Sequence, residues 1–394
     1  MVVAAFLGMA TKYSEGLLAV KYRTVAEDGH SLGGPFYYIE LGMGKNFKWL
    51  AKIFAFFGVC VGLFGIGTFS QVNGISSAVH GFFDPNDAFT VKILPFLGEY
   101  SWSVVIASLI LSFCVAAVLI GGVKRIASVS QIIVPFMAVI YFVFAVILIC
   151  CNITKVPAAF ATIVTAAFSP KAITGGAVGS MLIAMQKGVA RGIFSNEAGL
   201  GSAPIAAAAA QTNSPVRQGL VSMTGTFIDT IIICTLTGLS IVLTGAWQIE
   251  GLEGVQVTTY AFQHGLPFPA QFSSFILMLC LVFFAFTTIL GWDYYSERCL
   301  EYLSGGNMKH VKIFRWIYIL AVFIGPYMTV SAVWTIADIF NGLMAIPNMI
   351  ALFALSGVIV KETRAFFQHA KEEALAEHRS FEEVCEENLN EEEA

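Results

Sequence analysis

Residues 187–204 read KGVARGIFSNEAGLGSAP and interrupt a long apolar region of the chain. This short stretch contains Lys187, Arg191, Asn196 and Glu197 together with four glycines. Such residues destabilise a lipid-facing helix because hydrocarbon solvates neither charged groups nor unpaired backbone groups. The stretch therefore predicts a helix that is interrupted within the membrane, where something is bound or moved.

The composition of the whole chain is that of a membrane protein. Of its 394 residues, 57% are hydrophobic and only 12% are charged, and the mean hydropathy is +0.76. Soluble proteins contain about 25% charged residues. Several apolar runs exceed the roughly 20 residues that a helix needs to cross a bilayer, and the alternation of a β-barrel is missing. We therefore expect an all-α polytopic membrane protein in a lipid bilayer, with no indication of nucleic-acid binding.

The apolar runs predict about nine transmembrane helices, and the loops between them predict their orientation. The expected segments are 1–22, 53–79, 102–121, 129–151, 173–211, 219–244, 270–297, 313–332 and 335–360. Lys and Arg concentrate in one alternate set of loops, which by the positive-inside rule is cytoplasmic. The first segment should then run from outside to inside, and the carboxyl terminus should be cytoplasmic. Residues 1–361 form the expected transmembrane domain, and residues 362–394 form an acidic cytoplasmic tail that extends the last helix and then becomes a solvated segment.

The segment at 173–211 is too long for one crossing, and its glycines predict a break near 192–196. A break exposes carbonyls at the end of one half-helix and amides at the start of the next, a combination suited to a zwitterion and a cation. Ser195 and Asn196 would cap a second half-helix from about 197 to 210, and Phe194 would close the pocket. The alternative is a glycine-kinked helix that serves only packing.

Two other segments carry polar side chains at membrane depth. Gln71 lies well inside the second segment, among small residues that permit close helix packing. In the seventh segment, Thr287 and Thr288 offer adjacent hydroxyl ligands for a small cation, and Trp292 offers a rigid wall with one N–H donor. Threonine in a membrane helix also commonly bonds to its own backbone, which is the alternative reading.

The remaining intramembrane charges allow two interpretations each. Lys12 and Glu15 form an ion pair inside the bundle or, as we expect, mark the approach to the cytoplasmic surface. Asp229 is a proton-relay candidate or a structural carboxyl group. Glu197 caps the half-helix or couples to Lys187 or Arg191, and Asp338 with Asn341 is a candidate outer gate. Pro347 should kink the last segment.

No sequence pattern indicates an enzyme. The chain lacks an HExxH motif, a Ser/His/Asp order and a paired-carboxylate pattern, and its eight cysteines show no metal-ligand spacing. We therefore expect no catalytic residues.

Three motifs together resemble the alanine/glycine:cation symporter family, whose members are called sodium:alanine symporters. They are GIFSNEAGLGSAP at 192–204, MATKYSE at 9–15 and GGPFYYIE at 33–40. The resemblance implies a LeuT-like fold of ten core helices in two inverted repeats. It makes the first segment core helix two, the broken segment core helix six and the seventh segment core helix eight.

The resemblance also implies functional residues and a mechanism. Substrate contacts are expected from Gln71, Trp292 and the predicted break, and sodium ligands from Thr287 and Thr288. The substrate-contact residues of the predicted break are Gly192, Phe194, Ser195 and Asn196. The implied function is Na⁺-coupled uptake of alanine, glycine or a similar small neutral amino acid across the bacterial inner membrane by alternating access, with H⁺ as the other possible coupling ion.

One part of the family pattern has no counterpart in the sequence. Members begin with an extra helix and then core helix one, whose own break faces that of core helix six. The fold is therefore expected to be incomplete at the amino terminus: the true start lies upstream of Met1, or the chain is a truncated, non-transporting remnant with at most a binding role. The sequence indicates no oligomeric state.

Overall fold

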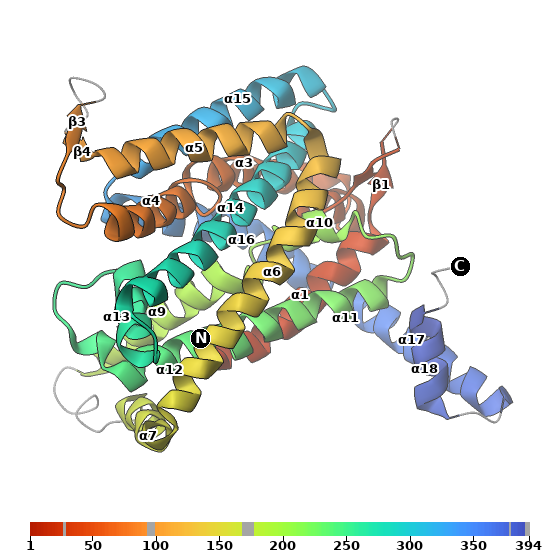
Figure 1. Cartoon of the computed structure of the whole chain (residues 1–394). Helices are drawn as coiled ribbons and strands as arrows, with labels where there is room; N and C mark the ends of the chain where they lie inside the picture. The colour runs from red at the N-terminus through yellow and green to blue at the C-terminus, as the bar shows by residue number, and fades with distance from the viewer. Residues whose placement is uncertain (27–28, 93–98, 168–176, 378–379, 391–394) are drawn as a thin grey trace.

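The computed structural model describes residues 1–26, 29–92, 99–167, 177–377 and 380–390. It is 82% helical, so the prediction of an all-α protein is confirmed. Two short antiparallel hairpins, β1–β2 and β3–β4, lie in loops outside the helical bundle (Figure 1). Their bounds are Thr24–Val25, Ser31–Leu32, Thr90–Lys92 and Glu99–Ser101.

Helices α1 to α9 lie in the first half of the chain, and helices α10 to α18 lie in the second half. In the first half they are α1 (Val2–Lys21), α2 (Pro35–Tyr37), η1 (Tyr38–Gly42), η2 (Lys45–Phe47), α3 (Lys48–Phe64), α4 (Phe69–Phe83), α5 (Trp102–Leu119), α6 (Gly122–Cys151), η3 (Ile153–Lys155), α7 (Val156–Ala167) and α9 (Ala177–Asn196). The second half contains α10 (Ala203–Ala207), α11 (Pro215–Thr226), η4 (Phe227–Cys234), α12 (Thr235–Thr244), η5 (Ala246–Gln248), α13 (Val255–Gly265), α14 (Ala270–Leu303), α15 (Met308–Ile324), η6 (Gly325–Tyr327), α16 (Val330–Ala354), α17 (Ser356–Glu377) and α18 (Phe381–Asn390).

Helix α14 is the centre of the packing. Its side chains enter three separate buried clusters, through Trp292 in one, Ile289 in the second and Leu277 in the third. Figure 1 shows α14 running through the middle of the molecule between α4, α6 and α16. Residues of the seventh predicted segment are therefore held by several helices at once.

Glycines on α3 let it approach α14 closely. A β-carbon at Gly58 would meet Cys299, and one at Gly62 would meet Ser296. Helices in a membrane gain little from the hydrophobic effect, so they associate by such close backbone packing. The predicted packing role of these small residues is confirmed.

Six stretches of the described residues are long and apolar enough to cross a membrane. They are Lys45–Phe83, Trp102–Leu119, Gly122–Cys151, Pro215–Thr244, Ala270–Leu303 and Val330–Ala354. These support a multi-pass membrane protein, whereas the count of nine spans stays a prediction. The expected start of one segment at residue 173 lies outside the described residues.

Three predicted segments are divided in the structure. The second is split between α3 and α4, where Gly65 and Gly67 end one helix before Thr68 precedes the next. The sixth contains a π-helical insertion, η4. The ninth runs past Pro347 without interruption and divides at Leu355 instead, since α16 ends at Ala354.

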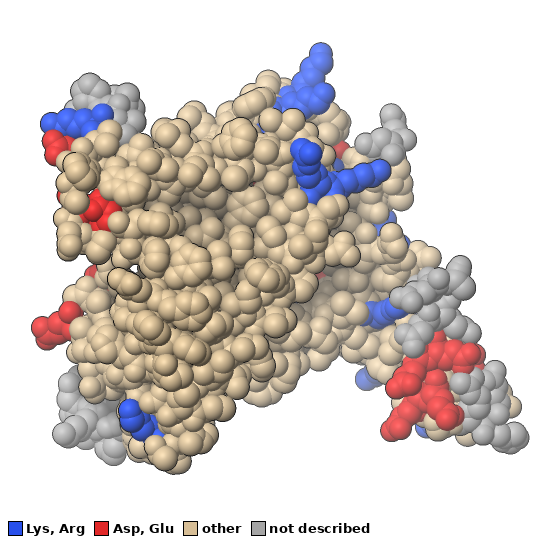
Figure 2. Space-filling view, viewed as in Figure 1, with Lys and Arg blue, Asp and Glu red and all other residues tan. Residues whose placement is uncertain are grey.

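The acidic tail folds into a helical hairpin. Helix α17 continues beyond residue 361, as expected, but α18 then folds back and buries Val384 against Ala370 and Ala374. The tail therefore does not become a solvated segment directly after the last helix, because its alanines provide a small apolar face. Figure 2 shows acidic side chains gathered over this hairpin and few charges elsewhere on the visible face.

Candidate substrate and ion site

The predicted helix break exists, but it lies one turn later than the sequence suggested. Helix α9 continues to Asn196, and α10 begins only at Ala203. The backbone between them takes positive φ at Glu197 (57°), Gly199 (86°) and Gly201 (84°). Glycine adopts this conformation without strain, which explains why the chain breaks at residues 197–202 rather than at 192–196.

Two expectations about this region are wrong. Ser195 and Asn196 do not cap a second half-helix, because both lie in the last turn of α9, as do Gly192 and Phe194. The second half-helix does not extend from 197 to 210, since α10 has only five residues. An amide-lined anion site at the start of a long half-helix is therefore missing from the described residues.

Glu197 fixes the break from the side of α14. Its carboxylate accepts hydrogen bonds from the indole Nε1 of Trp292 at 2.9 Å and from the hydroxyl of Ser202 at 2.7 Å. Trp292 is 1% exposed, so its indole ring is enclosed by protein where it reaches from α14 to Glu197. Both of these interactions involve a charged acceptor and are therefore stronger than ordinary hydrogen bonds. Glu197 is a structural acceptor here, rather than a helix cap or a partner of Lys187.

Glu15 and Asn348 fix the break from the opposite side. Glu15 Oε1 accepts from the backbone N–H of Gly201 at 3.1 Å and from Asn348 Nδ2 at 2.7 Å. Asn348 Nδ2 also donates to the carbonyl of Gly199 at 2.9 Å, and Tyr38 donates to Asn348 Oδ1. The expectation that Glu15 approaches the surface is wrong, because its exposure is 0%.

A cavity of about 450 Å³ opens beside the last turn of α9. Its lining residues come from eight helical elements, α4, α6, α9, η4, α12, α13, α14 and α16. Its polar and aromatic lining includes Gln71, Tyr141, Ser195, Asp229, Thr237 and Trp334. Of the six residues predicted to contact the substrate, only Gln71 and Ser195 line this cavity. Gly192, Phe194, Asn196 and Trp292 are not among its lining residues.

Asp229 is the charged group of this cavity. It accepts from both Ser195 Oγ, at 2.9 and 2.8 Å, and Thr230 Oγ1, at 2.8 Å. It lies in the π-helical segment η4, which changes the register of the helix face turned toward α9. Such insertions are frequent at functional sites. The sequence marked Asp229 as a membrane-depth charge, but it gave no sign of its pairing with Ser195.

An ion pair joins α9 to α16 next to the cavity. Arg191 Nη2 lies 2.7 Å from Asp338 Oδ2, and the guanidinium stands over the ring of Trp334 at 4.1 Å. The ring of Phe194 packs against Trp334 with centroids 4.7 Å apart. Phe194 thus supports the cavity wall through Trp334, a residue that the sequence analysis missed.

Comparison with known proteins places this chain in a family. Residues 1–380 match the model of the Sodium:alanine symporter family. The chain belongs to this family. It is 53% identical over 372 residues to an uncharacterized transporter of Haemophilus influenzae, covering 94% of the chain and 76% of that protein.

Two further relatives have names that agree with this family. The Sodium/alanine symporter AgcS of Methanococcus maripaludis is 45% identical over 379 residues, or 95% of this chain and 78% of AgcS. The Amino-acid carrier protein AlsT of Bacillus subtilis is 34% identical over 373 residues, or 94% of this chain and 74% of AlsT. The chain is thus a sodium-coupled amino-acid symporter and not an enzyme.

The predicted sodium ligands of this symporter lie on α14. Thr287 Oγ1 donates to the carbonyls of Phe283 and Phe284, and Thr288 Oγ1 donates to that of Phe284. These are the backbone bonds that the alternative interpretation expected. A hydroxyl that donates one hydrogen bond keeps lone pairs for a cation. Both threonines therefore fit a sodium site by their chemistry, and the assignment stays a prediction.

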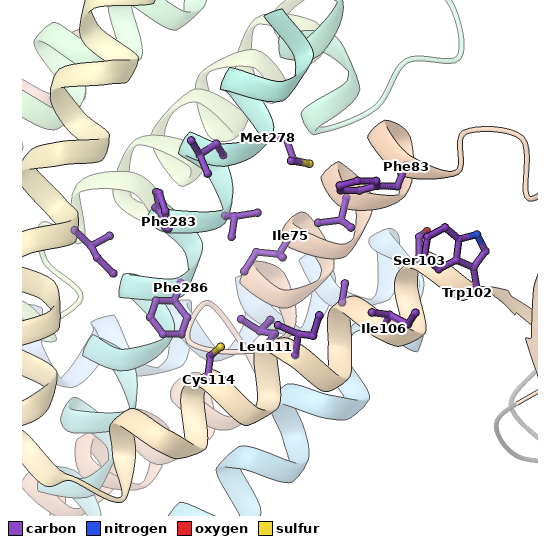
Figure 3. A pocket seen from close by; sticks show the side chains of 16 residues that line it. Ile75, Phe83, Trp102, Ser103, Ile106, Leu111, Cys114, Met278, Phe283 and Phe286 are labelled. Atoms are coloured by element: carbon purple, nitrogen blue, oxygen red, sulfur yellow. The ribbon is translucent and has the colours of Figure 1, made fainter. Parts of the chain in front are cut away.

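A second cavity of this symporter, of about 490 Å³, lies between α4, α5, α6 and α14. Its lining is almost entirely apolar, with Ile75, Leu111 and Phe283 pointing into it (Figure 3). A zwitterion would lose its hydration there without gaining polar partners, which is unfavourable. The first cavity is therefore the better candidate for the amino acid.

Proposed function

We propose that this symporter carries alanine, glycine or a similar small neutral amino acid with Na⁺, by alternating access around the cavity of Gln71 and Asp229. The observation that carries the proposal is that a carboxyl group, Asp229, and an amide, Gln71, both line one mostly apolar cavity. An ammonium group pairs with a carboxylate, and an amide N–H₂ can donate to a carboxylate group. These two groups suit the two ends of a zwitterion.

The size of the substrate follows from the aromatic walls. Tyr141 and Trp334 line the cavity, and Phe194 backs Trp334. Rigid aromatic side chains move less readily than aliphatic ones, so a large substrate side chain would meet them. We therefore expect selection for small side chains, in keeping with the name of one relative, the Sodium/alanine symporter AgcS.

The architecture proposed for this function is the LeuT-like inverted repeat, with Na⁺ held near Thr287 and Thr288. The helix break and Trp292 connect that sodium site to the substrate cavity, because Trp292 follows the threonines on α14 and bonds to Glu197. Na⁺ binding and substrate binding would then be coupled through α14, because this helix contacts both the sodium site and the helix break.

Uptake by proteoliposomes tests the proposal. The chain is reconstituted, and labelled alanine is added with an inward Na⁺ gradient, an inward H⁺ gradient or neither. We expect accumulation with the Na⁺ gradient alone. Uptake that ignores the gradient would reject sodium coupling, and the absence of alanine binding and uptake would favour the non-transporting alternative.

The proposed location is the bacterial inner membrane, with the α17–α18 hairpin in the cytoplasm. The basis is the excess of Lys and Arg in the loops on that side. Cys385 lies in this hairpin and is partly exposed. In a variant that retains only this cysteine, a membrane-impermeant maleimide should label it in inverted vesicles and not in intact cells; the reverse pattern would overturn the orientation.

A further inference from the structure

A buried carboxyl group on α14, Asp293, has no partner in the chemistry described so far. Its exposure is 0%, and neither of its oxygens meets a hydrogen-bond donor among the described residues. An ionised carboxylate in this position would lose its hydration without compensation, at a cost of several kcal/mol. The group must therefore be neutral or hold a ligand.

Its neighbour Glu297 makes the ionised state of Asp293 still less favourable. Glu297 is 1% exposed and lies one helical turn further along α14, on the same side of the helix as Asp293. Two carboxylates can form a hydrogen bond only when one of them carries a proton, because an ionised carboxylate has no donor. Two adjacent buried negative charges would also repel each other.

The nearby cations are already paired. Arg315 of α15 donates two hydrogen bonds to Glu297, at 2.7 and 2.9 Å. Arg298 pairs with Glu301 at 2.6 Å. Glu297 is thus the hydrogen-bond acceptor of the carboxyl pair, since it accepts both bonds of a guanidinium. Asp293 is left as the member that holds the proton.

We propose that Asp293 is an exchangeable proton-binding site of this chain, with Glu297 as the acceptor of its carboxyl hydrogen bond. The ligand is a proton taken from water. Binding converts the Asp293 carboxylate into a carboxylic acid, and release returns the proton to water. Arg315 has a side chain that is 20% exposed, so the polar groups around the pair extend to the molecular surface at α15.

The groups around Asp293 favour a proton over a metal cation. The charged and titratable side chains that face it are Glu297, Arg298, Arg315 and Tyr318. The guanidinium of Arg315 would repel a bound sodium ion. Helix α3 meets this face with glycines, Gly58 and Gly62, which supply no further cation ligand through a side chain.

Asp293 also lies close to a contact that joins α14 to the interruption between α3 and α4. The hydroxyl of Tyr318 contacts two carbonyls, that of Gly67 at 3.1 Å and that of Ile289 at 2.7 Å. It thereby connects the interruption between α3 and α4 to α14, one turn before Asp293. Separation of these helices would admit water to the carboxyl pair and allow the proton to exchange.

Infrared spectroscopy of the purified full-length chain in nanodiscs tests the proposal without substrate or a sodium gradient. At neutral pH we expect a C=O stretching band of a protonated carboxylic acid. ¹³C labelling of aspartate carboxyl groups should shift this band in the unmodified chain, and transfer to deuterium oxide should shift it again. The band should be lost in Asp293→Asn and kept in Glu362→Gln, which alters an exposed ion pair with Lys21.

Each of the other results would overturn the proposal. If aspartate labelling shifts no protonated band, Asp293 is ionised. If the band survives Asp293→Asn, the proton lies on another aspartate. A band that does not respond to deuterium oxide after days would show a locked structural proton instead of an exchangeable one. The labelling result does not depend on the folding of a variant, and failure of alanine uptake would leave it unaffected.

Discussion

Replacing Gly201 by alanine tests whether the break at residues 197–202 is the structural centre of the site. Gly201 has φ 84°, and a β-carbon there would lie 2.7 Å from both Phe54 and Pro35. The left-handed backbone costs an alanine about 1–2 kcal/mol. Overpacking against two buried rings adds about 1–3 kcal/mol. We therefore expect a loss of about 2–5 kcal/mol in the free energy of unfolding.

A matched control separates the two contributions. Gly245 has φ 72°, but a β-carbon there would meet nothing within 4 Å. Gly245→Ala should then cost only the backbone part, about 1–2 kcal/mol. Equilibrium unfolding in mixed micelles measures both variants, and alanine uptake should fall further in Gly201→Ala. Equal losses in the two variants would refute the reasoning, because the close packing at Gly201 would then contribute nothing.

Three further substitutions test individual contacts of the site. Trp292→Phe removes the indole donor to Glu197 and should cost about 1–3 kcal/mol of unfolding free energy, measured in the same micelles. Asp338→Asn removes the charge that pairs with Arg191 and should speed the release of bound labelled alanine by about twofold to fivefold, measured by a dilution chase. Asp229→Asn should raise the KM for alanine uptake by about tenfold or more while leaving kcat less changed, since a charged partner of the ammonium is lost; an unaltered KM would contradict its role.

The sequence predicted the existence of the break better than its place. Glycine at 199 and 201 supplies positive φ at low cost, and this local property decides where the helix ends. Ser195 and Asn196 looked like caps because their side chains favour helix starts. In the structure both side chains face η4. Ser195 donates a hydrogen bond to Asp229, and Asn196 donates one to Thr230. For Ser195 a tertiary partner has replaced the local one, whereas Asn196 Oδ1 still accepts from the backbone N–H of Ala198 at 2.9 Å.

The polar partners of the break could not be found from sequence spacing. Glu15 and Asn348 are 333 residues apart in the chain, and their hydrogen bond depends on the packing of α1 against α16. The sequence placed Glu15 on one helical face with Lys12, and of the two interpretations the approach to the cytoplasmic surface was favoured over a buried ion pair. Only the arrangement of the helices shows that its carboxylate reaches the backbone of Gly201. Long-range contacts of this kind carry no signal in a single sequence.

These partners also bear on where a substrate can bind. The amide of Gly201 and the carbonyl of Gly199 already have protein partners, Glu15 and Asn348. An amino acid that bound directly to these groups would have to displace a buried carboxylate, which would then lack its hydrogen bonds at a cost of about 1–3 kcal/mol or more. The cavity beside α9 requires only that Ser195 release Asp229. This difference favours binding next to the break, with the break acting as the rigid support that places Ser195 and, through Glu197, links it to Trp292.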